Sequence, residues 1–104
     1  GLRWRWNGRL WKPVLMKLTD DVATAGRAQQ LLDNKEFTTA VEIVEKRYLE
    51  ALLAADPTDD MGRFRLAEAI RVVRMVVRHL QIVVEGGKLS KATLEAMTGG
   101  KSRF

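Results

Sequence analysis

Aromatic and basic side chains alternate at the start of the chain, on both sides of the dipeptide Asn7-Gly8. A two-residue type I′ hairpin turn favours Asn-Gly because both of its central residues need positive φ. The pattern therefore predicts a β-hairpin whose second strand ends before Pro13, which has no N–H to donate. Alternation would place on one face Trp4, Trp6, Arg9 and Trp11. The opposite face would carry Arg3, Arg5, Leu10 and Lys12.

Two longer segments carry apolar residues at alternating steps of four and three, which is the spacing of a single helix face. The first apolar face runs over residues 37–55 and the second over residues 66–84, with Pro57 between them. Proline commonly stands just after a helix end, and a short connection makes neighbouring helices antiparallel. We therefore predict helices over residues 34–55 and 59–86, packed as an antiparallel hairpin.

Polar residues indicate where the helices begin. Asp33, followed by Glu36 in a capping-box pattern, is expected to cap the first hairpin helix, and Thr58 to cap the second. Thr19, followed by two aspartates, predicts the start of a shorter helix that runs through residue 32. Acidic pairs after a threonine are explained by capping, so they are not expected to bind a cation.

Glycines and Ser90 define the predicted end of the fold. The pair Gly86-Gly87 predicts the end of the second hairpin helix, and Ser90 is expected to cap a short helix over roughly residues 91–98. The predicted fold is mainly α, an antiparallel two-helix hairpin with flanking short helices and an N-terminal β-hairpin arm. Its parts would be the Trp/Arg arm (residues 1–15), the helical domain (residues 16–98) and a basic tail (residues 99–104).

Composition limits the classes of protein to which this chain can belong. At 104 residues with 46% hydrophobic and 30% charged residues, it is one small globular unit. There is no cysteine, which excludes disulfides, zinc ribbons and thiol catalysis. No apolar run has the length of a transmembrane helix. Met16 could be an internal start, which would make residues 1–15 a separable appendage.

The net charge of +5 is concentrated at the two ends of the chain. Residues 1–18 carry five bases and no acid, whereas residues 19–87 carry nine bases and twelve acids. Basic ends on an acidic body suit contact with a polyanion or with an acidic neighbouring copy.

The predicted helix over residues 59–86 has more apolar surface than one neighbouring helix can cover. A helix that is apolar around most of its circumference is usually buried by several neighbours. Another subunit is the natural candidate for the surplus, so we expect a homo-oligomer. The expected oligomer interface comprises Val72, Met75, Val76, Ile82 and Val83.

Three arginines of the same helix, Arg71, Arg74 and Arg78, would form one basic stripe. Such a stripe can contact phosphates, although the commoner explanation is a solvated face paired with nearby acids. The possible nucleic-acid contacts are Arg3, Arg5, Lys12, Arg71, Arg74 and Arg78.

No motif indicates a reaction. His79 is the only histidine and lacks the further ligands at helical spacing that a metal site needs. The glycine pairs lack the strand–turn–helix context of a phosphate-binding loop, and no serine lies in a nucleophile motif. We therefore expect no enzyme activity, metal, cofactor or small-molecule substrate.

The Trp/Arg arm has three interpretations. Cross-strand tryptophans can stabilise a hairpin that packs on the helices or on a neighbouring subunit. Alternatively, indoles can stack on bases while arginines hold phosphates, or the arm can lie at a membrane surface. We favour protein contact through Trp4, Trp6, Arg9 and Trp11 and expect no membrane partner.

A resemblance adds to this picture. Residues 27–37 (RAQQLLDNKEF), Tyr48-Leu49-Glu50-Ala51, Arg78-His79-Leu80 and residues 84–89 (VEGGKL) resemble short helical-hairpin proteins from the head and packaging genes of tailed phages and prophages. The similarity covers roughly residues 25–96 and leaves out the Trp-rich start. It implies a non-enzymatic virion or packaging component that acts through oligomeric contacts.

We therefore expect a self-associating assembly protein whose arm binds a neighbouring subunit or another structural protein. The alternative is a DNA-binding packaging factor of the small-terminase type. Either would be located in the host cytoplasm or in the virion.

Overall fold

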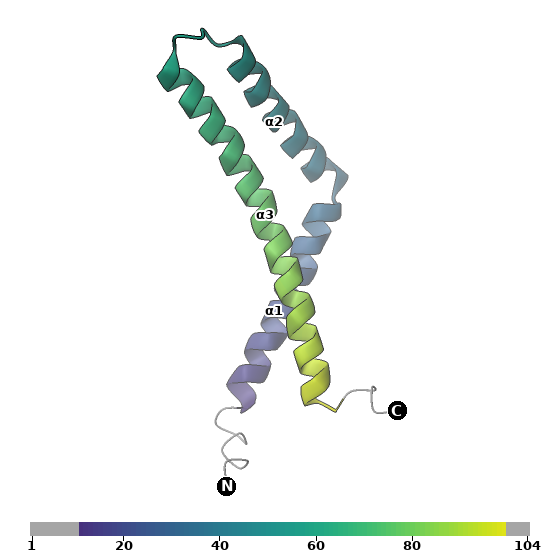
Figure 1. The fold of residues 1–104 in the computed structure, drawn as a ribbon. Coiled ribbons are helices and arrows are strands. Elements are labelled where there is room, and N and C mark those ends of the chain that lie inside the picture. The colour runs from purple at the N-terminus through teal and green to yellow at the C-terminus, as the bar shows by residue number, and fades with distance from the viewer. Residues whose placement is uncertain (1–10, 100–104) are drawn as a thin grey trace.

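The computed structural model describes residues 11–99, which form three helices connected by short turns (Figure 1). These are α1 (Trp11–Asp33), α2 (Lys35–Ala54) and α3 (Asp60–Met97). The prediction of a mainly helical fold is confirmed. The described residues contain no strand.

Helices α1 and α3 cross at small side chains. A Cβ added to Gly87 would collide with the Cβ of Ala25 and lie 3.4 Å from the backbone oxygen of Asp21. One turn further along, the hydroxyl of the buried Ser90 donates to Oδ2 of Asp21 over 3.2 Å. Glycine here permits close backbone approach, so these contacts fix an antiparallel register between α1 and α3.

Helix α2 is less well packed. It has no buried residue, and α3 contacts α1 more extensively than it contacts α2. The apolar face expected to form a seam over residues 37–55 is only half-buried or exposed. The antiparallel hairpin of these two helices, predicted as the basis of the fold, is therefore not confirmed, and the more extensive packing is at the α1–α3 crossing.

The prediction of a strand over residues 9–12 is wrong where it can be compared, because Trp11 and Lys12 begin α1. Pro13 is the third residue of α1, where the backbone N–H has no intrahelical acceptor and its absence costs nothing. The proposed turn at Asn7-Gly8 lies outside the described residues. The helix start expected at Thr19 is also wrong, since its hydroxyl donates to the Leu15 carbonyl within α1.

The predicted helix end at Gly86-Gly87 is wrong as well. Helix α3 continues through both glycines for 38 residues in all, and the short helix expected over 91–98 is its last part. Ser90 is therefore not a cap. It lies inside α3 and contacts α1.

Both hairpin-helix caps lie one residue after the predicted ones. The N-cap of α2 is Asn34, whose side chain accepts from the Phe37 N–H over 2.8 Å. The N-cap of α3 is Asp59, which accepts from the Gly62 N–H over 3.0 Å. Asp33 instead accepts from the Gln29 amide inside α1.

Replacing Asn34 by alanine is therefore expected to lower the free energy of unfolding by about 0.5–2 kcal/mol, because the Phe37 N–H loses its acceptor. Asp33→Ala, the matched change one residue earlier, should cost less than half as much. Urea denaturation followed by circular dichroism compares the two variants at one protein concentration. Equal losses would contradict the assignment of Asn34 as the cap.

The fold is an open rod rather than a compact bundle. It measures 69 × 29 × 19 Å, with a radius of gyration of 21.3 Å. A compact chain of this length would have a radius of gyration of about 13 Å. Both termini of the described segment lie at one end of the rod and the α2–α3 connection lies at the other (Figure 1).

Candidate oligomer interface

The expected interface residues form a largely exposed apolar stripe on α3. Exposed fractions are 55% for Val72, 61% for Met75, 52% for Val76 and 53% for Ile82, whereas Val83 is half-buried. Side chains of this size normally lose most of their exposure on folding. We call Val72, Met75, Val76, Ile82 and Val83 the α3 stripe.

Two shallow apolar grooves meet at Val76. One groove, of about 410 Å³, lies on the α3 stripe and also includes His79 and Leu80. The other, of about 250 Å³, lies between α2 and α3 and is lined by Phe37, Ala40, Val41, Val44, Val73 and Val76. Val76 lines both grooves, so one substitution there affects both.

Sequence patterns missed a further apolar surface at the α2–α3 connection. Leu53 lies in the last turn of α2 and is 78% exposed, while Met61 and Phe64 in the first turns of α3 are 59% and 60% exposed. All three lie off the helix faces that the apolar spacing predicts. Hydropathy without spacing, applied to the residues beside Pro57, could have identified them.

Four carboxylates lie close in sequence to these apolar residues. Glu50, Asp56, Asp59 and Asp60 form no ion pair within residues 11–99. Hydrogen bonds from the Thr58 hydroxyl and then from its backbone N–H lower the pKa of Asp56 below its ordinary value. We call Leu53, Asp56, Asp60, Met61 and Phe64 the tip.

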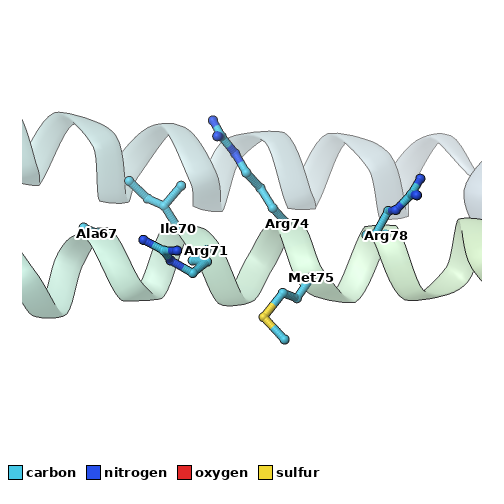
Figure 2. A pocket seen from close by; sticks show the side chains of 6 residues that line it. All are labelled: Ala67, Ile70, Arg71, Arg74, Met75 and Arg78. Atoms are coloured by element: carbon cyan, nitrogen blue, oxygen red, sulfur yellow. The ribbon is translucent and has the colours of Figure 1, made fainter.

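The predicted basic stripe is present on α3, but carboxylates neutralise two of its three arginines. Arg71 Nε lies 3.3 Å from Glu68 Oε1, and Arg74 Nε lies 2.8 Å from Oε1 of Glu45 on α2. Figure 2 shows Arg74 extending toward α2 while Met75 points away from it. Arg78 forms no ion pair with the described residues. Among these three arginines, Arg74 is therefore the one whose ion pair connects α3 to α2.

Residues 11–99 also have no net charge, because they include 13 lysines and arginines and 13 aspartates and glutamates. The other predicted phosphate contact in this range, Lys12, is an exposed residue of α1. Arg3 and Arg5 lie outside the described residues. The basic character of the chain therefore belongs to its ends.

This charge distribution predicts weak DNA binding by the helices. A phosphate contact raises the affinity for DNA by displacing counterions, and we expect neither Arg71 nor Arg78 to make such a contact. Changing both to glutamine should therefore alter the affinity for duplex DNA by less than about twofold. Fluorescence anisotropy over a salt series would measure the affinity for duplex DNA, with Arg65→Gln as the control. A fall in the salt slope by about two, one per lost phosphate contact, would instead indicate a DNA-binding face.

Of the four residues predicted to bind a partner through the arm, Trp11 is the one that the structure describes, and it is half-exposed in the first turn of α1. Trp4, Trp6 and Arg9 lie outside the described residues.

Within residues 11–99, no group of three or more histidine, cysteine, aspartate or glutamate side chains could hold a metal ion. His79 is exposed on α3. Of the three described helices, none is long and apolar enough to cross a membrane.

Comparison with known proteins adds no assignment: no family model, no curated protein and no solved structure matches this chain.

Proposed function

We propose that this chain is a non-enzymatic assembly protein that works by associating with further copies of itself. The observation that carries the proposal is the near absence of a core. Among the described residues only Ala25, Ala28, Ile70 and Val84 are buried hydrophobics, and no side chain is fully buried. A chain with so little burial gains stability by covering its apolar surface with a partner.

The area of exposed surface supports this proposal. The accessible surface is 8418 Å², whereas a compact monomer of this mass would expose about 5,900 Å². A stable protein–protein interface buries about 1,200–2,000 Å² in total. The excess is therefore large enough for a dimer interface and leaves some surface for further contacts.

In this proposal, α2 and α3 form a hairpin scaffold, and the α3 stripe provides the self-association surface. The Trp/Arg arm binds a neighbouring subunit. The resemblance to phage head and packaging proteins suggests a virion or the host cytoplasm as the setting.

Sedimentation velocity of the full chain from low to high micromolar concentration tests the proposal. We expect a dimer or larger species that dissociates on dilution, with a melting temperature that rises with protein concentration. A monomer over the whole range, with a constant melting temperature, would overturn the proposal.

A further inference from the structure

The tip and the first ten residues have complementary chemistry. Residues 50–65 hold four carboxylates and two guanidiniums around three exposed apolar side chains. Residues 1–10 hold three arginines, two tryptophans, two leucines and no acid. Tryptophan can cover exposed apolar side chains while arginine pairs with carboxylates, so each segment offers what the other lacks.

The first residues of a chain cannot reach the tip of the same chain. The Ser90–Asp21 contact and the Gly87–Ala25 contact make α1 and α3 antiparallel, so Trp11 lies on the far side of Ser90 from the tip. From Ser90 to Met61 the axis of α3 extends for about 43 Å. Trp4 is seven residues from Trp11, and seven extended residues span at most about 25 Å.

The position of the α3 stripe indicates how the first ten residues of a second copy would reach the tip. Residues 72–83 lie at the middle of α3, with 12 helical residues before them and 14 after them. A two-fold axis at this position lays the stripe of one copy antiparallel on the stripe of the other, with nearly full overlap. The same axis brings the α1 start of one copy level with the tip of its partner, because the start of α1 and the end of α3 lie at the same end of the rod (Figure 1).

We propose that the tip binds residues 1–10 of a second copy in an antiparallel dimer. The complementary charges, the limited reach of these residues within their own chain and the central position of the α3 stripe support this arrangement. The inference rests on the self-association proposed above and names its orientation and its second contact. The two-fold axis forms the contact twice, once at each end of the rod. Nucleic acid and anionic lipid are poorer occupants, because the tip carboxylates repel phosphates.

Cross-linking between single-cysteine variants tests the contact, since the natural chain has no cysteine to interfere. Asn7→Cys places a thiol in the first ten residues without removing a tryptophan or arginine. Leu53→Cys places one at the tip, and the control Leu89→Cys places one at a position that is 70% exposed near the other end of α3. Both helix positions are exposed, so neither change should disturb folding.

Equal amounts of tagged Asn7→Cys chain and untagged partner are treated with a short bis-maleimide and separated by size. We expect the cross-link to Leu53→Cys to exceed the cross-link to Leu89→Cys by about tenfold, and to weaken in 1 M salt, where the Debye length is about 3 Å. Equal yields, or more product with Leu89→Cys, in a sample that sediments as a dimer would overturn the tip contact alone. A monomer by sedimentation would overturn the self-association itself.

Discussion

Replacing Gly87 by leucine is expected to lower the free energy of unfolding by about 3 kcal/mol or more, although leucine is the better helix former. Even a single Cβ at this position would collide with Ala25 and lie 3.4 Å from the Asp21 backbone. Neither of these neighbours is the flexible end of a side chain, so α1 and α3 would have to separate at their crossing. Urea denaturation at one fixed protein concentration measures the loss.

Gly26→Leu is the matched control. Gly26 is an exposed helical glycine next to Ala25, and a Cβ built there meets nothing within 4 Å. This change should leave stability unchanged or raise it by up to about 1 kcal/mol, through helix propensity. A loss as large as that of Gly87→Leu would show that helical glycines in general, rather than the crossing, control stability.

A double-mutant cycle locates the effect further. Gly87→Ala should be destabilising in the natural chain but less so together with Ala25→Gly, because removing the Ala25 methyl makes room for the new one. Additive effects of the two changes would contradict direct contact between these positions.

The same glycine shows what the sequence could and could not predict. The adjacent glycines Gly86 and Gly87 have no side chains, so they are equally compatible with a helix end and with close packing of two helices. The choice depends on Ala25 and Asp21, which are more than sixty residues away in the chain. Ser90 was ambiguous for the same reason, because its hydroxyl bonds to Asp21 rather than to its own helix terminus.

The sequence predictions were more accurate where the residues that decide between two structures lie close together in the chain. The inward face of α3 follows from apolar spacing, and the N-caps of α2 and α3 were predicted to within one residue because adjacent residues had suitable side chains. At Pro13 two local rules conflict, since proline both ends strands and is accepted in the first turn of a helix. The strand interpretation was wrong for Trp11 and Lys12.

The candidate interface was predictable only in part. The α3 stripe follows from counting apolar positions around one helix, and four of its five residues are indeed exposed. The tip was missed because Leu53 comes from one helix and Met61 and Phe64 from the next, and only the turn between the helices brings them to one end of the rod. Surfaces built from several elements require the fold, whereas a surface on a single helix does not.

Val76→Glu is expected to dissociate the oligomer while leaving the helices folded. Val76 is 52% exposed in the isolated chain, so a charge there stays in contact with water and should change monomer stability by less than about 0.5 kcal/mol. In an assembled stripe the carboxylate would be removed from water without a partner. A central interface residue of this kind contributes about 2–4 kcal/mol, which corresponds to a dissociation constant about 30 to 1,000 times higher.

Ala92→Glu is the control, because Ala92 is an exposed residue of α3 outside the stripe. Sedimentation velocity should find Val76→Glu monomeric at concentrations where the natural chain and Ala92→Glu are both associated. Circular dichroism should give all three the same helix content. If Val76→Glu associates as strongly as Ala92→Glu, the stripe is not the self-association surface, and the excess accessible surface of the rod must be covered elsewhere.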